Sequence, residues 1–383
     1  MLLKIRSLRT YLVAPRWLFL RIDTDEGVTG WGEPIVEGRA GTVVAAVAEL
    51  GKYLIGADPL CIEEHWQVLS KSGFYRGGPI LSSAVAGIDQ ALWDIVGKTR
   101  GVPVHELLGG PVREKIRVYS WIAGDEPSEA ASAAVVQVKN GFTAVKMNAG
   151  NAMGPIDTPR SVDTAVERVA AVREAVGPDI DVAIDFHGRV SPAMARRLLP
   201  RLEAYTPLFV EEPVVPELGG SLRDLVMCSP VPIATGERLY SRWDFRSALE
   251  AGIAVVQPDV SHAGGISEMR RIAAMAEVYG AVLAPHCPLG PVALAACLQV
   301  GFATPNFLIQ EQSLGIYDSN RSGLLEYLVD PSIFAYQHGY VPRLVGPGLG
   351  IEIDAAAVER AAEIGHHWRN PVWRLPDGGR TEW

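Results

Sequence analysis

The chain has 383 residues and a formal net charge of −9, because 44 aspartates and glutamates outnumber 35 lysines and arginines. That balance argues against a nucleic acid or an anionic membrane surface as the partner. No apolar stretch approaches the ~20 residues that span a bilayer, and the first residues lack the continuous apolar centre of a signal peptide. The four cysteines form no CxxC pair, as is usual in a reducing compartment. We expect a globular protein of the cytoplasm.

The first hundred residues predict a small domain of strands followed by helices. Apolar and polar residues alternate over most of residues 3–33, as in strands, and a turn is predicted at 25–27. Stretches near 41–54 and 80–98 have the apolar spacing of helices. The Gly-Gly-Pro run at 109–111 then marks a boundary.

From about residue 116 the sequence becomes periodic. Eight short apolar runs read as strands, and the intervals between them leave room for one helix and two loops each. Eight such periods predict an α/β fold in which parallel strands close into a barrel wrapped in helices, in preference to a doubly wound open sheet. No dinucleotide fingerprint or phosphate loop follows any strand. The predicted strands cover residues 116–124, 144–150, 181–187, 208–214, 232–238, 255–261, 282–288 and 307–313.

Residues beyond about 330 leave this period. A helix is predicted over 354–364, and the Trp- and Arg-rich run WRNPVWRLP follows it. We expect this tail to pack back on the first domain.

Polar and ionisable residues stand at the ends of most predicted strands, where barrels of this kind carry their chemistry. Asp185, Glu211 and Glu237 end three successive strands. Three carboxylates held together need a cation, since otherwise their pKa values would rise steeply, and oxygen ligands favour Mg²⁺ or Mn²⁺ over zinc. Each carboxylate alone could cap a helix or pair with an arginine, but the three together favour a metal site. Other strand ends carry Lys146, Asn148, His187, Asp259, His286 and Glu311.

Two of the eight histidines belong to this set. His187 and His286 end predicted strands within reach of the proposed metal, whereas the others are expected to be structural or solvated. Asp259 could orient His286 and raise its basicity, or it could hydrogen-bond to its own loop. The sequence leaves both alternatives open.

Several segments resemble a known family. DFHGRV, LFVEEPV, GERLYSR, QPDVSHAGGI and LAPHCPLGP are similar to the enolase superfamily, in its mandelate racemase branch, and the resemblance extends over essentially the whole chain. It implies a modified TIM barrel, (β/α)7β, in which the eighth helix is missing. It also implies an α+β capping domain, formed by residues 1–112 together with the C-terminal residues 331–383, over a catalytic barrel of residues 113–330.

The resemblance also implies a role for each residue at the barrel mouth. Carried over to this chain, the family's metal site is one Mg²⁺ per subunit (Mn²⁺ is an alternative) bound by Asp185, Glu211 and Glu237. The resemblance further implies a general base at His286 with Asp259 as its partner, a general acid at His187, and stabilisation of the enediolate by Glu311. On physical grounds we expect Lys146 to supply a second positive charge there.

The implied reaction is the dehydration of an aldonic sugar acid, with D-galactonate as the expected substrate. The base removes the C2 proton and the acid protonates the departing 3-hydroxyl, which gives a 2-keto-3-deoxy acid. Racemases of this branch carry a Lys-x-Lys pair whose second lysine is a base on the opposite face. This chain reads Lys146-Met147-Asn148, so that base is absent and elimination is favoured. Asn148 is expected to bind substrate instead.

Three alternatives remain at this point: a dehydratase of another aldonate such as gluconate, an epimerase of the same branch, and a non-catalytic relative that binds sugar acids. Arg16 and Trp17 in the first domain are candidates for contact with the substrate, although an exposed surface arginine is the favoured alternative for Arg16. Members of the family usually form homo-oligomers, and we expect the same here.

Overall fold

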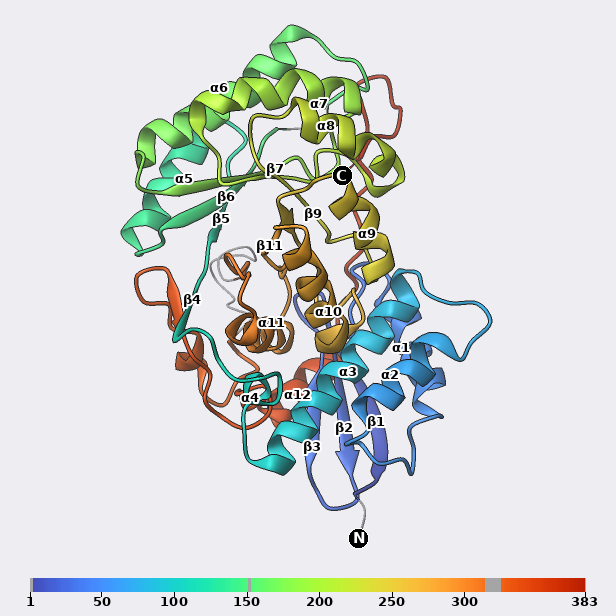
Figure 1. Cartoon of the computed structure of the whole chain (residues 1–383). Helices are drawn as coiled ribbons and strands as arrows, with labels where there is room; N and C mark the ends of the chain where they lie inside the picture. The colour runs from blue at the N-terminus through green and yellow to red at the C-terminus, as the bar shows by residue number, and fades with distance from the viewer. Residues whose placement is uncertain (1–2, 151–152, 314–324, 383) are drawn as a thin grey trace.

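The computed structural model describes residues 3–150, 153–313 and 325–382, so residues 314–324 of the predicted barrel domain lie outside the described part. Figure 1 shows two parts, one built on strands β1 to β3 and the other on the sheet that contains β5 to β11. None of the helices in the described ranges is long and apolar enough to cross a membrane.

The N-terminal part is an antiparallel sheet covered by helices. Its strands, in the order β1-β2-β3, are β1 (Ile5–Val13), β2 (Trp17–Thr24) and β3 (Thr29–Gly32). The predicted helices are present as α1 (Ala40–Gly51) and α3 (Pro79–Arg100). Sequence reasoning missed α2 (Ile62–Lys71), because only three of its ten residues are buried and its apolar stripe is correspondingly narrow. The short helix α4 (Val104–Leu107) ends this part.

Helix α3 lies directly against strand β3 because glycines allow the two backbones to touch. A Cβ atom on Gly32 would lie 1.9 Å from the carbonyl oxygen of Gly87. This contact brings polar side chains of α3 within hydrogen-bond distance of the backbone of β3 and of Glu33, the next residue. Asp94 accepts a hydrogen bond from the N–H of Trp31, and Gln90 accepts one from the N–H of Glu33.

We expect the substitution Gly32→Ala to lower the free energy of unfolding by about 1–3 kcal/mol, because its methyl group would overlap the backbone of α3. Urea denaturation measures the change. Gly41→Ala in α1 is the matched control, since nothing lies within 4 Å of a Cβ at that position. Equal stability of the two variants would contradict the close contact between β3 and α3.

The larger part is a barrel of parallel strands, each followed by a helix. Its seven strands are β5 (Ser120–Ile122), β6 (Ala144–Asn148), β7 (Asp181–Asp185), β8 (Val210–Glu211), β9 (Ile233–Thr235), β10 (Val255–Val256) and β11 (Val282–Leu283). The helices that follow them are α5 (Pro127–Lys139), α6 (Pro159–Val176), α7 (Pro192–Leu198), α8 (Leu222–Cys228), α9 (Arg242–Glu250), α10 (Gly265–Val278) and α11 (Pro291–Ala303). Short 3₁₀ helices cover Leu199–Tyr205, Pro216–Ser221 and Pro331–Phe334.

Two of the predicted strands, 307–313 and 116–124, are not formed in the structure as predicted. The run 307–313 is not a strand; it closes the barrel through single parallel bridges, Leu283 with Phe307 and Val118 with Gln310. The run 116–124 is divided, because β4 (Lys115–Arg117) leaves the barrel and pairs with β12 (Tyr340–Pro342). The (β/α)7β prediction is confirmed, since seven strand–helix units precede the closing segment in the described residues. The interior is filled by a side chain from each of the eight segments: Tyr119, Ala144, Ala183, Phe209, Ala234, Val255, Ala284 and Ile309.

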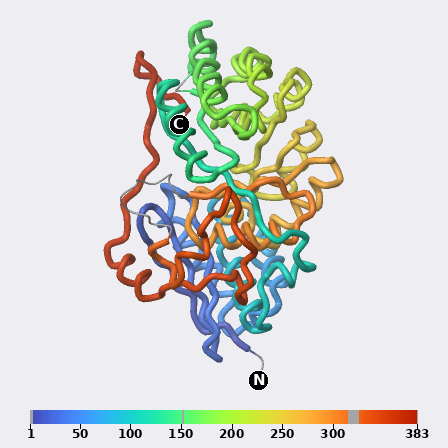
Figure 2. The backbone as a smooth tube through the Cα atoms, turned by 90° about the vertical axis from the view of Figure 1, so that its left-hand side faces the viewer, coloured from blue at the N-terminus to red at the C-terminus, as the bar shows by residue number. Residues whose placement is uncertain are grey.

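The C-terminal segment contacts both parts of the molecule. Helix α12 (Ala355–Ile364) matches the predicted 354–364 and lies against β1. The Tyr327 hydroxyl donates a hydrogen bond to the carbonyl of Ala14. Beyond α12 the chain runs along one side of the molecule toward the barrel helices (Figure 2), where the Arg189 guanidinium lies 4.5 Å from the centre of the Trp373 ring.

Candidate active site

A cavity of about 470 Å³ lies at the carboxyl ends of the barrel strands, with walls from both parts of the molecule. Because parallel strands of a barrel end at the same face, residues far apart in the sequence converge there. Eight of the eleven predicted site residues line the cavity: Arg16, Lys146, Asn148, Asp185, His187, Glu237, His286 and Glu311. Glu211 and Asp259 are fully buried beside it.

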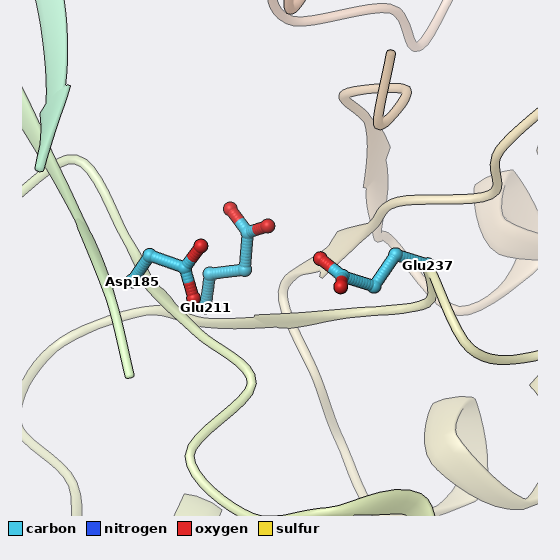
Figure 3. A group of neighbouring side chains, drawn as sticks. All are labelled: Asp185, Glu211 and Glu237. Carbon is cyan, nitrogen blue, oxygen red and sulfur yellow. The ribbon is translucent and has the colours of Figure 1, made fainter. Parts of the chain in front are cut away.

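Three carboxylates form a candidate metal site. Asp185 and Glu211 are the last residues of the neighbouring strands β7 and β8, and Glu237 follows β9. One oxygen from each lies within 4.8 Å of the others, and Figure 3 shows the three side chains gathered around one space. Burial, followed by the charge of Asp185, raises the pKa of Glu211 well above its usual value. Burial and the charge of Glu212 raise the pKa of Glu237 to about 7.

This triad fits a hard divalent cation. The donor set contains only oxygen, which is the preference of Mg²⁺ and Mn²⁺. The pKa values of Glu211 and Glu237 are raised because these carboxylates are removed from water and lie close to other negative charges. A bound cation would relieve this repulsion. The structure therefore supports a site able to hold a metal ion, as the sequence predicted.

Lys146 lies beside the triad and is almost fully buried. Its ammonium group is 2.6 and 2.7 Å from the two oxygens of Glu211 and 3.0 Å from Glu311. Burial alone would lower the pKa of Lys146, but these carboxylates raise it well above its usual value. A lysine held in the protonated state can donate hydrogen bonds and positive charge but cannot act as a base.

His286 and Asp259 form a hydrogen-bonded pair. Nδ1 of His286 lies 2.8 Å from Oδ2 of Asp259. The other oxygen of Asp259 accepts a bond from the backbone N–H of Ser261, so both alternatives left open by the sequence are realised at once. Nε2 of His286 lies 3.6 Å from Glu237 and 3.9 Å from Glu311. Although burial would lower the pKa of His286, the charges of Glu237 and Glu311 raise it well above its usual value.

His187 reaches the cavity by a turn rather than by the alternation of a strand. Strand β7 ends at Asp185, and His187 has a left-handed backbone conformation with φ of 53°. The N–H of His187 donates to Oδ1 of Asp185 at 2.6 Å. The turn thus ties the predicted acid to a predicted metal ligand, and both line the same cavity.

Glu311 and Asn148 complete the floor of the cavity. Glu311 accepts bonds from the N–H of Cys287 and from the indole of Trp121. Burial would raise the pKa of Glu311, but Lys146 and His286 hold it below its usual value. Asn148 lines the cavity, and its buried Oδ1 has no hydrogen-bond partner among the described residues.

The N-terminal part and the tail supply residues that sequence reasoning partly missed. Arg16 is largely buried and forms an ion pair of 2.6 Å with Glu37, so it is not an exposed surface arginine. Glu37 and Asn370 also line the cavity, but neither belongs to a periodic element that could have predicted it. The structure does not bring Trp17 to the site. Its ring is fully buried and stacks on Phe19, which lies two residues further along β2 and therefore points to the same face of the strand.

Comparisons with known proteins agree with this architecture. Residues 7–109 match the mandelate racemase/muconate lactonizing enzyme N-terminal domain, and residues 129–357 match the enolase C-terminal domain-like family. The chain belongs to the enolase superfamily. D-galactonate dehydratases of Ralstonia pickettii and Pectobacterium atrosepticum are 54% and 53% identical to it, over 100% of each chain. This member of the superfamily is therefore an enzyme, of the hydro-lyase class.

Solved structures of the superfamily resemble the chain along nearly all of its length. A putative galactarate dehydratase from Agrobacterium radiobacter, with bound Na and L-malate, has a TM-score of 0.92 and 34% identity, over 99% of this chain and 100% of that one. A putative dehydratase from Mesorhizobium loti has a TM-score of 0.88 and 34% identity, over 94% of this chain and 98% of that one.

Proposed function

We propose that the enzyme dehydrates D-galactonate to 2-dehydro-3-deoxy-D-galactonate with Mg²⁺ as its cofactor. The observation that carries the proposal is the grouping of a carboxylate triad, the His286–Asp259 pair and His187 around one cavity. This grouping occurs in a chain that is 54% identical, over its full length, to a D-galactonate dehydratase. The structure of a putative galactarate dehydratase with bound L-malate adds that a related protein binds a 2-hydroxy acid.

Proton removal from C2 is assigned to His286. Its Nδ1 is bonded to Asp259, so the pair fixes the ring and leaves Nε2 facing the cavity to accept the proton. The protonated Lys146 supplies a positive charge beside the substrate carboxylate, where charge accumulates in the enediolate. Asp185, Glu211 and Glu237 would hold a Mg²⁺ ion, which would supply further positive charge to stabilise the enediolate and to offset the carboxylates that raise the pKa of His286.

Loss of the 3-hydroxyl is assigned to His187. Hydroxide is a poor leaving group, so the oxygen must receive a proton as its bond to C3 breaks. The backbone bond from His187 to Asp185 fixes this residue relative to the triad. The enol that remains after water leaves tautomerises to the 2-keto-3-deoxy acid.

Recognition of the rest of the sugar acid is assigned to the N-terminal part and the tail. Arg16, Glu37 and Asn370 line the cavity, and Asn148 offers an unpaired acceptor. We propose the corresponding division of the chain into a cap, residues 1–112 and 331–383, and a catalytic barrel, residues 113–330. Association into a homo-oligomer belongs to the same proposal, and sedimentation velocity tests it.

An assay of aldonic acids with Mg²⁺, followed by detection of the 2-keto acid product, tests the substrate. D-galactonate and D-gluconate differ in the configuration at C4. A site that hydrogen-bonds the hydroxyls should therefore prefer D-galactonate by about 10² or more in kcat/KM. Turnover of D-gluconate without D-galactonate would refute the assigned substrate. Exchange at C2 without loss of water from any aldonate would favour an epimerase of the branch.

A further inference from the structure

The Asp259–His286 pair is assembled from two separate loops. Asp259 lies in the loop between β10 and α10, and His286 lies in the loop between β11 and α11. The distance of 2.8 Å between them therefore depends on how each loop is held. Two fully buried polar residues of the N-terminal part, Glu33 and Gln90, contact these loops, and the proposed chemistry leaves both without a role.

Glu33 holds the loop that carries His286. Its two carboxylate oxygens accept hydrogen bonds from the N–H groups of Gly290, at 2.7 Å, and Ala293, at 3.0 Å. Helix α11 begins at Pro291, and no side chain of its own sequence caps it at Gly290. Glu33 therefore caps this helix from another part of the molecule, where a carboxylate complements the helix dipole.

The fit between Glu33 and the start of α11 is tight. A Cβ atom on Gly290 would lie 2.7 Å from Oε1 of Glu33, so the carboxylate occupies the space that a side chain would need. Burial raises the pKa of Glu33 to about 8, against the opposing effect of the backbone bonds from Ala293 and Gly290. A carboxyl group in such a place is costly unless its contacts are required.

Gln90, on helix α3, holds the loop that carries Asp259. Its amide nitrogen donates to Oγ of Ser261 and to the carbonyl of Val260, both at 3.2 Å. The N–H of Ser261 in turn donates to Asp259 at 2.7 Å. The amide oxygen of Gln90 accepts the backbone N–H of Glu33 at 2.9 Å. The two residues are thus bonded to each other, and each contacts a different loop.

We propose that Glu33 and Gln90 are positioning residues that set the geometry of the Asp259–His286 pair for proton transfer. This inference rests on the proposed role of His286 as the base. Neither residue touches the substrate; they act by fixing two loops of the barrel against one rigid point in the cap. Because a displacement of about 1 Å at a reacting group can cost 10²-fold in rate, loss of either contact acts on catalysis as well as on stability.

The test compares the full-length variants Glu33→Gln and Gln90→Met with the control Asp94→Asn. Asp94 lies one turn beyond Gln90 on α3 and is equally buried. It accepts bonds from the N–H groups of Trp31 and Leu349, which belong to neither loop. The measurements are kcat and KM for D-galactonate and, without substrate, the downfield proton resonance of the His286 Nδ1–H, assigned by its loss in His286→Asn.

We expect kcat to fall about 10- to 100-fold in Glu33→Gln and Gln90→Met, with KM within about twofold of wild type. The His286 resonance should shift or broaden in both variants as its bond to Asp259 is disturbed. Asp94→Asn should lower the melting temperature but leave kcat and the resonance unchanged. Folded Glu33→Gln and Gln90→Met proteins with wild-type kcat and an unchanged resonance would overturn the inference.

A milder variant keeps the inference testable if the first two fail to fold. Ser261→Ala removes only the hydroxyl that accepts from Gln90, and a several-fold lower kcat with a shifted resonance supports the inference, whereas wild-type values overturn it. The resonance also separates this inference from the proposed function. A wild-type protein that dehydrates no aldonate refutes the function, and the resonance of the variants still decides the positioning role.

Discussion

The substitution His286→Asn is expected to lower kcat for D-galactonate by about 10³ and to stop exchange of the C2 proton with solvent deuterium. Asparagine can still bond to Asp259 through its amide, but it has no atom in the place of Nε2 that could accept the proton. Proton NMR of the substrate in deuterated water follows the C2 signal directly. Exchange at the wild-type rate in the variant would show that His286 is not the base.

His187→Asn is the matched variant for the other half of the reaction. We expect dehydration to fall by about 10²–10⁴, while exchange at C2 continues, because the base and the triad remain in place. If His286→Asn stops exchange of the C2 proton, His187→Asn permits it, and both variants lose dehydration, the two histidines act in separate steps. Loss of exchange in both variants would contradict that division.

Much of the site could be predicted because strand ends are readable in the sequence. A buried strand is a short apolar run, so the polar residue at its end is easy to place, as with Asp185 and Glu211. The barrel then brings these ends together whatever the helices between them look like. The same reasoning placed His286 and Glu311, which line the cavity as expected.

Residues whose position depends on contacts between distant segments could not be predicted in this way. Glu37 and Asn370 enter the cavity from a loop and from the tail, and neither has a local pattern. Arg16 and Trp17 were predicted together, but Arg16 lies in the turn before β2 and lines the cavity, whereas Trp17 is the first residue of β2 and its side chain is fully buried. No local sequence pattern predicts a role for Glu33, since the groups that its carboxylate binds are backbone N–H groups more than 250 residues away.

The limits of the strand predictions have a physical cause as well. The run 307–313 has the composition of a strand, but its glutamines bond to backbone carbonyls of other segments, Gln310 to Pro285 and Gln312 to Tyr119. Side-chain bonds of this kind complete the barrel closure where only single bridges form. Periodicity predicts where a segment lies in the barrel but not which of its groups make the bonds.

Removal of divalent cations with a chelator is expected to abolish activity, and Mg²⁺ is expected both to restore it and to stabilise the fold. The folded chain gathers Asp185, Glu211 and Glu237 within 4.8 Å, whereas the unfolded chain does not, so the cation binds the folded state selectively. At a free Mg²⁺ concentration 100 times the Kd, this linkage adds about 2.7 kcal/mol to the free energy of unfolding. Thermal unfolding at increasing Mg²⁺ measures the effect without substrate.

Matched carboxylate variants identify the source of this stabilisation. Glu237→Gln removes one oxygen ligand of the triad and should remove most of the Mg²⁺ response. Glu268→Gln alters a carboxylate that is more deeply buried than Glu237 and that pairs with Arg242 and Arg271 away from the triad, so it should retain the full response at a lower starting stability. If Mg²⁺ shifted the melting temperature of both variants equally, the cation would be bound elsewhere, and the charge that stabilises the enediolate would have to come from Lys146 alone.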